Sequence, residues 1–122
     1  MLPGLKDGDH ALFSRSFDSP VRADIVVFHY PAEPSKSYIK RIIGLPNEEL
    51  EIRDGKVLIN GQSITEPYVD ARNNLSARPY GPLKIPADNY FVMGDNRDNS
   101  NDSRSWGPLP RKFIYGQFVR KY

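Results

Sequence analysis

The strongest constraint on the fold of this chain is that its apolar residues come in short runs, each ended by a turn residue. The run Ile25–Tyr30 stops at Pro31, and the isoleucine-rich run Tyr38–Leu45 stops at Pro46. Runs of this length, rich in β-branched and aromatic residues and bounded by proline or glycine, are typical of β-strands. No stretch repeats apolar residues at the three- and four-residue spacing of an amphipathic helix. The sequence therefore predicts an all-β fold.

The clearest local prediction is a tight hairpin in the middle of the chain. Two short strand-like runs, Leu50–Arg53 and Lys56–Ile59, are joined by Asp54-Gly55. An Asp-Gly pair favours the two-residue turn in which both central residues have positive φ. Asn60-Gly61 then predicts a second turn directly after the hairpin.

The remaining pattern predicts one domain over residues 1–122. Further strands are expected at Tyr90–Met93 and at Phe113–Arg120. Residues 66–86 contain four prolines and a weak apolar pattern, so they are expected to form a long loop or a small β excursion from the core. The expected architecture is a set of mostly antiparallel, irregular sheets or a partly open barrel.

The composition excludes several classes of function. Seventeen basic against fifteen acidic residues give a net charge of +2, which is too balanced to indicate nucleic acid as the main partner. The absence of cysteine removes disulfides, thiolate metal sites and cysteine nucleophiles. No apolar run approaches the ~18 residues needed to span a bilayer, so the chain as given is expected to be soluble.

A lysine stands inside one of the most apolar predicted strands. Strand side chains alternate between two faces, so Lys40 shares a face with Tyr38 and Ile42, and Arg41 points to the opposite face. At least one of these cations is expected to face an apolar layer. Burial lowers the pKa of a lysine and leaves a neutral amine that can act as a base near pH 7. The alternative is a lysine whose stem covers the core while its amine reaches solvent at the sheet edge.

Gly94–Arg104 is the densest polar run in the chain, and three interpretations of it compete. The first is a solvated loop, because Asp, Asn and Ser favour turns. The second is a calcium loop, but the EF-hand spacing counted from Asp98 places Ser103 where glycine is needed and Leu109 where glutamate is needed.

The third interpretation of this run is the wall of an active site. In this arrangement Ser100 hydrogen-bonds a neutral lysine amine and orients it. Asp102 and Arg104 pair and fix the shape of the loop. The residues by themselves leave the solvated loop and the active-site wall open.

Three segments together resemble the type I signal peptidases, the leader peptidases that use a Ser/Lys dyad. Tyr38–Pro46 reads Tyr-Ile-Lys-Arg-Ile-Ile-Gly-Leu-Pro, against the family's Tyr-Ile-Lys-Arg-x-x-Gly-Leu-Pro. Gly94–Arg104 matches the family's Gly-Asp-Asn-Arg-Asp-Asn-Ser-x-Asp-Ser-Arg throughout. Asp24–Phe28 resembles the family's Gly-Asp-Ile-Val-Val-Phe strand, with Ala23 in place of the glycine. Asn47 also stands where a glycine is usual, which a residue tolerant of the left-handed conformation allows.

This resemblance implies a serine endopeptidase that removes signal peptides from exported preproteins. Lys40 would be the general base that deprotonates the serine and later activates water. Ser100 would orient the Lys40 amine, Asp102 and Arg104 would hold the loop, and Arg41 would be structural. No metal or other cofactor is expected.

The resemblance also implies how a preprotein binds. The signal peptide would lie in extended form beside the backbone of Ser37–Ile39, in a β-augmentation mode. Met1, Leu5, Tyr38 and Ile39 would line shallow pockets for small residues such as alanine. The expected partners are therefore preproteins and the membrane, and not nucleic acid.

The start of the chain falls inside the family's first motif, Ser-Met-x-Pro-Thr-Leu, whose serine is the nucleophile. Met1, Pro3 and Leu5 match this motif and Gly4 replaces the threonine, so the serine would immediately precede Met1. The 122 residues alone are therefore expected to be inactive. In the full protein, N-terminal helices would anchor the catalytic domain on the extracytoplasmic face of a membrane. The alternative is a non-catalytic homologue that binds signal-peptide-like segments without cleaving them.

Overall fold

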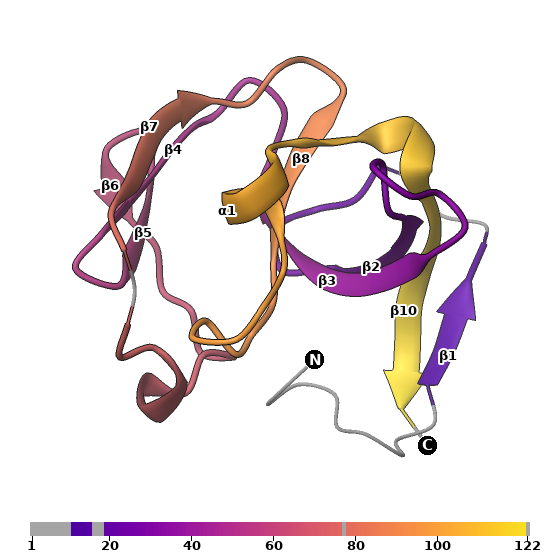
Figure 1. Ribbon diagram of the computed structural model, residues 1–122, viewed down its shortest axis with the longest axis horizontal. Helices are drawn as coiled ribbons and strands as arrows, with labels where there is room; N and C mark the ends of the chain where they lie inside the picture. Colours follow the sequence, from indigo (N-terminus) through magenta and orange to yellow (C-terminus); the bar gives the residue numbers. More distant parts are fainter. Residues whose placement is uncertain (1–10, 16–18, 77, 122) are drawn as a thin grey trace.

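The strands of this chain form two antiparallel sheets in the computed structural model, which describes residues 11–15, 19–76 and 78–121 (Figure 1). The large sheet has six strands in the order β1-β10-β2-β3-β8-β9, and the small sheet has four in the order β6-β5-β4-β7. The strands of the large sheet are β1 Ala11–Ser14, β2 Ile25–His29, β3 Ser37–Gly44, β8 Asn89–Met93, β9 Leu109–Pro110 and β10 Ile114–Lys121. Those of the small sheet are β4 Glu49–Arg53, β5 Lys56–Ile59, β6 Gln62–Ser63 and β7 Tyr80–Lys84.

The predicted all-β fold of mostly antiparallel sheets is confirmed. The six strands expected from the sequence agree with β2, β3, β4, β5, β8 and β10 to within one residue at each end. The one-turn helix α1, Ser103–Trp106, and the 3-10 helices Ala71–Asn73 and Arg111–Phe113 were not expected. Helices this short cannot display the spacing that marks an amphipathic helix in a sequence.

The predicted hairpin between β4 and β5 is confirmed in its turn geometry. Asp54 and Gly55 have φ values of 53° and 76°, and Arg53 pairs with Lys56 across the turn. The following turn is built in the same way, with φ values of 52° at Asn60 and 85° at Gly61. Asn47 also adopts the left-handed conformation, with φ 69°, as expected of a residue at a glycine position.

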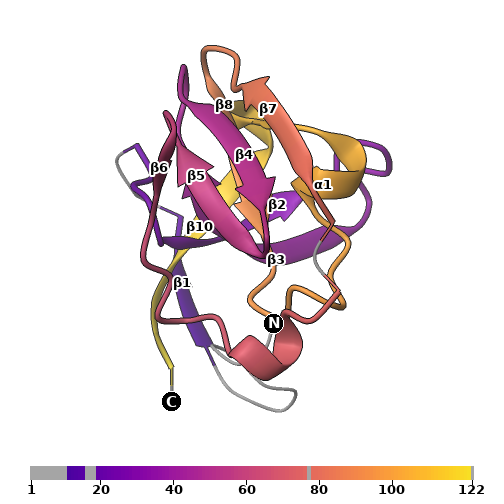
Figure 2. The same ribbon diagram turned by 90° about the vertical axis from the view of Figure 1, so that its left-hand side faces the viewer.

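Strand β3 lies between two apolar clusters, one on each of its faces. Ile42 packs with Val26, Phe28 and other side chains of the large sheet, whereas Ile43 packs with a cluster that β4 and β5 of the small sheet complete. Both isoleucines are fully buried. Figure 2 shows the small sheet from its outer side, with β4, β5 and β6 next to one another. The small sheet therefore covers one face of β3, and the other face packs in the cluster of the large sheet.

Residues 66–86 follow β6, contain strand β7 of the same small sheet, and lead on toward β8 of the large sheet. They contain the 3-10 helix Ala71–Asn73 and strand β7, which pairs with β4. Ile85, directly after β7, is fully buried in the cluster between the sheets.

The change of burial along β3 predicts a sharp contrast between two of its isoleucines, Ile42 and Ile39. Ile42→Ala should lower the free energy of unfolding by about 2–5 kcal/mol, because it leaves a cavity in a packed cluster. Ile39→Ala on the same strand should cost less than about 1 kcal/mol, because the Ile39 side chain is already 37% exposed. Urea unfolding of the two variants measures both values. Equal losses would show that β3 is not packed as described.

Candidate active site

The first half of strand β3, from Ser37 to Lys40, has a neighbouring strand on only one side in the described part of the chain. On one side, β2 pairs with Ser37 through Arg41. On the other side, the pairing with β8 begins only at Arg41, which lies opposite Met93. No strand in the described part of the chain pairs with residues 37–40 on that side, so their backbone is open to a further extended segment.

Lys40 points to the face of the large sheet that carries Val26 and Ile42. It lies directly across from Val26 on β2, which is fully buried. The Lys40 amine donates a hydrogen bond of 2.9 Å to Ser100 Oγ, and it lies 5.9 Å from the centre of the Tyr38 ring. Burial lowers the pKa of Lys40; the charge of Asp102 opposes this shift and that of Arg104 adds to it. The amine is thus held in one place, and burial disfavours its charged form.

Gly94 allows Ser100 to reach Lys40. A Cβ atom built on Gly94 would overlap the Ser100 hydroxyl, and it would lie 2.7 Å from Ser100 Cβ and 3.5 Å from Lys40 Nζ. The Gly94 amide donates to Asp102 Oδ2 at 3.1 Å. The end of β8 and the polar run are therefore in direct contact, and any side chain at this position would push them apart.

Asp102 and Arg104 form the expected pair. Arg104 donates to both carboxylate oxygens of Asp102, at 2.9 Å from Nε and 2.8 Å from Nη2. Burial acts to raise the pKa of Asp102, but the guanidinium of Arg104 and two backbone amides outweigh it and hold the pKa below its ordinary value. Asp102 also caps the first turn of α1 by accepting from the Arg104 amide.

Arg41 makes the corresponding pair on the opposite face of β3. Its guanidinium donates to both oxygens of Asp95, at 2.9 and 2.8 Å, and to the carbonyl of Ala23 at 2.8 Å. Asp95 is fully buried. Ala23 itself has φ 77°, in the left-handed region that favours glycine.

The carboxylates of the polar run have separate partners. Asp95 pairs with Arg41, Asp102 pairs with Arg104, and Asp98 accepts from the backbone amides of residues 75 and 76. Among the residues that the structure describes, no group of three or more His, Cys, Asp or Glu side chains is placed to hold a metal ion. One of these contacts lies within the run, and the other two fasten the run to β3 and to residues 75 and 76.

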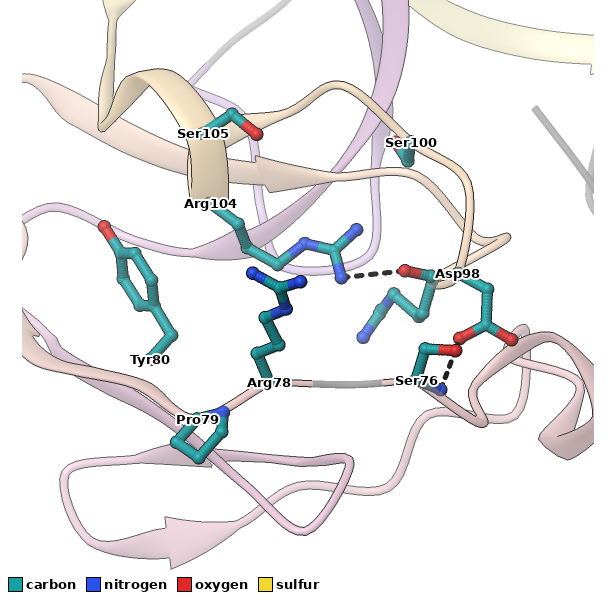
Figure 3. Close-up of a pocket in the computed structure, with 9 residues that line it drawn as sticks. Ser76, Arg78, Pro79, Tyr80, Asp98, Ser100, Arg104 and Ser105 are labelled. Atoms are coloured by element: carbon teal, nitrogen blue, oxygen red, sulfur yellow. Dashed lines mark hydrogen bonds between the residues drawn. The ribbon is translucent and has the colours of Figure 1, made fainter.

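A polar cavity of about 450 Å³ borders Ser100 on the side of Arg104 (Figure 3). The guanidinium groups of Arg78 and Arg104 extend toward one another in it. Ser100 thus contacts the Lys40 amine and also lines this cavity. The residues that line the cavity are Ser76, Arg78, Pro79, Tyr80, Arg97, Asp98, Ser100, Arg104 and Ser105.

The structure brings most of the residues singled out from the sequence into one region. Lys40, Ser100, Asp102 and Arg104 are linked by the contacts described above, and Arg41 lies on the other face of the same strand. Ser37, Tyr38 and Ile39 precede Lys40 on the open stretch of β3, with Ser37 and Ile39 exposed. Met1 and Leu5 lie outside the described residues.

Sequence reasoning missed the part that Gly94, Asp95 and Arg97 play around Lys40, although all three belong to the polar run. It also missed Glu66 and Tyr68, which contact Arg97. For the first three, the exact match of the run to the family pattern was an available signal. For Glu66 and Tyr68 the sequence offered none, since they lie about thirty residues from Arg97 and follow no apolar period.

Comparison with known proteins gives a consistent result. The chain matches the family model described as signal peptidase, peptidase S26, over residues 1–122. It is 42% identical to signal peptidase I of Leptolyngbya laminosa, covering 100% of this chain and 64% of that protein. It is 41% identical to a probable signal peptidase I-2 of Synechocystis, covering 98% and 58%. The chain therefore spans less than two thirds of the length of these relatives.

A solved structure supports the same relation. The crystal structure of a signal peptidase I from Enterococcus faecalis superposes with a TM-score of 0.76 at 35% identity. The match covers 85% of this chain and 100% of that one.

The lowered pKa of Lys40 predicts how stability depends on pH. Because the pKa is lower in the folded protein than its ordinary 10.5, the unfolded chain binds more protons between the two values. Stability should therefore rise with pH across that window, by at most about 1.4 kcal/mol per pH unit. Lys40→Met should lose this rise. Urea unfolding at a series of pH values measures both proteins, and parallel curves would contradict the assignment.

The close contact at Gly94 predicts a coupled pair of substitutions. Gly94→Ala should cost about 1–3 kcal/mol of stability, because the new methyl group displaces Ser100. In a Ser100→Gly background the same substitution should cost much less, since the side chain that it strikes is gone. A double-mutant cycle on unfolding free energies measures this coupling. Additive costs would show that the two residues do not touch.

Proposed function

The chain belongs to the signal peptidase family, peptidase S26, and on this basis we propose that it is the catalytic part of a signal peptidase I. The proposed reaction is hydrolysis of the peptide bond that joins a signal peptide to an exported preprotein. The proposed catalytic groups are a serine and Lys40, acting as a Ser/Lys dyad.

The observation that carries this proposal is the environment of the Lys40 amine. Its pKa is lowered by burial, and one N–H is committed to the neutral hydroxyl of Ser100. A neutral amine fixed by one N–H can direct its lone pair at another proton. A base whose pKa has moved toward neutral pH is what activation of a serine needs, and lysine can replace histidine in this part.

The proposed nucleophile is a serine immediately before Met1, because Met1, Pro3 and Leu5 match the family motif that this serine begins. Lys40 takes the serine proton as the serine oxygen attacks the carbonyl carbon of the scissile bond. The resulting ammonium returns the proton to the leaving amine, and an ester to the serine remains. Lys40 then deprotonates a water molecule, which hydrolyses the ester and frees the serine.

The proposed substrate site is the open edge of β3. The backbone of residues 37–40 has no strand partner on one side in the described part of the chain, so an extended signal peptide can pair with it. Tyr115 donates a 2.6 Å hydrogen bond to Ser37 Oγ, which supports the start of this edge from β10. Tyr38 and Ile39, with Met1 and Leu5, are proposed to line pockets for small residues near the cleavage site.

The proposed partners of the full protein are preproteins and the membrane through which they pass. We propose that an N-terminal helix anchors the protein and that the catalytic part lies on the extracytoplasmic face. No helix in the described ranges is long and apolar enough to cross a membrane. A homologue that only binds signal peptides would not need a lysine with a lowered pKa, so the Lys40 environment favours catalysis over that alternative.

The test is cleavage of a preprotein by the chain extended at its N-terminus with the serine and the upstream segment. The extended protein should cut after a small-x-small sequence, and Lys40→Ala should reduce kcat by roughly a thousandfold or more. Lys36→Ala is the matched control, because Lys36 is an exposed lysine just before the same strand.

Two outcomes would contradict the proposal. Unchanged cleavage by Lys40→Ala would remove Lys40 from the mechanism. The 122 residues alone should not cleave, so robust cleavage by them would place the nucleophile inside this chain.

A further inference from the structure

Glu66 forms an unusually buried ion pair with Arg97. Arg97 Nη1 and Nη2 donate to the two carboxylate oxygens of Glu66, at 3.1 and 2.6 Å. The two side chains are only 2% and 9% exposed, and no other ion pair among the described residues has both members so deeply buried. Removing two charges from water costs several kcal/mol, so such a pair adds little net stability. The pair instead holds the segment around Glu66 and the polar run around Arg97 in a fixed position relative to each other.

Arg97 passes this constraint to the residues around Lys40. Its Nε donates to the carbonyl of Gly94 at 2.9 Å, and its own carbonyl accepts from Arg104 Nη1 at 2.9 Å. Gly94 is the residue against which Ser100 packs, and Ser100 holds the Lys40 amine. A continuous series of contacts therefore leads from Glu66 through Arg97 to Lys40.

Tyr68 adds a second link, to the strand that carries Lys40. Its hydroxyl donates to Glu66 Oε2 at 3.1 Å. The guanidinium of Arg41 lies 4.2 Å from the centre of its ring, and that of Arg97 lies 6.0 Å away. Burial and the charge of Glu66 raise the pKa of Tyr68, so the phenol keeps its proton and remains a donor. One ring thus contacts both β3 and the polar run.

We propose that Glu66 and Tyr68 are positioning residues, which clamp the polar run to β3 and so keep Ser100 within hydrogen-bonding distance of the Lys40 amine. The inference rests on the proposed role of Lys40 as the base. Neither residue touches the Lys40 amine, so both act through Arg97 and Arg41. The segment between β6 and β7 is thereby part of the proposed catalytic arrangement.

The alternative is that these contacts only stabilise the fold, and the pKa of Lys40 separates the two cases. The charges that act on this amine are those of Asp102, Arg104 and Asp95, and removing the negative charge of Glu66 would by itself lower the Lys40 pKa. A rise in the Lys40 pKa on altering Glu66 must therefore come from a change of geometry. Loss of stability alone leaves the pKa of the folded protein where it was.

The experiment is an NMR titration of the Lys40 Cε resonance in Glu66→Gln, together with a pH–rate profile of the extended enzyme. Glu66→Gln should raise the pKa of Lys40 toward its ordinary value, because a loosened run lets water reach the amine. It should lower kcat about 10- to 100-fold with little change in KM, as loss of supporting contacts does elsewhere. Glu51→Gln, which removes the exposed pair with Arg53, is the matched control and should change neither.

Two further variants keep the test decisive if Glu66→Gln folds poorly. Tyr68→Phe keeps the ring beneath Arg41 and should nearly retain the Lys40 pKa, whereas Tyr68→Leu should raise it. Leu83→Ala, which weakens packing at the small sheet, should lower stability and leave the Lys40 pKa unchanged.

An unchanged Lys40 pKa in folded Glu66→Gln and Tyr68→Leu would overturn the clamp. Because the titration does not depend on cleavage, this result is distinct from failure of the proposed function. That failure would appear instead as full activity of Lys40→Ala.

Discussion

Strand β3 is packed on both faces, so each of its two consecutive cations must be accommodated inside the protein. Lys40 reaches Ser100 and Arg41 reaches Asp95, and both partners come from the single polar run that follows β8. One segment therefore meets β3 from both sides. This arrangement leaves the run little freedom, because a shift that improved one contact would break the other.

The two cations receive different partners, and the difference decides their chemistry. Arg41 is given a buried carboxylate in bidentate geometry, which suits a group that stays charged. Lys40 is given a neutral hydroxyl, while the nearby Asp102 is already occupied by Arg104. Among the residues that the structure describes, the ammonium form of Lys40 therefore has no ion-pair partner that would offset its burial, and burial lowers its pKa. Two cations one residue apart thus differ in their surroundings: Arg41 is held by a carboxylate as a charged group, and Lys40 is the candidate base.

Much of this could be predicted from the sequence, because the relevant signals are local. The alternation of β3 placed Lys40 and Arg41 on opposite faces, and Asp54-Gly55 predicted the hairpin turn with its positive φ values. The pairing of Asp102 with Arg104 spans only two residues, and it was part of one of the interpretations of the polar run. What the alternation could not reveal is which face holds which partner, since this depends on the small sheet. Strands β6 and β7 are short, polar or interrupted by proline, and their pairing depends on distant segments.

The small sheet and its connecting segment also contribute to the surroundings of Arg41 and Arg97. It covers the face of β3 on which Arg41 lies, and the connection between its strands β6 and β7 supplies Glu66 and Tyr68. An exposed pair between Arg41 and Asp95 would be screened by water and worth little. In the proposed clamp, Tyr68 covers this pair, and the pair holds the polar run where Ser100 contacts the Lys40 amine. Through the proposed clamp, the connection between β6 and β7 therefore reaches the lysine on the opposite face of β3 by way of Arg97 and Arg41.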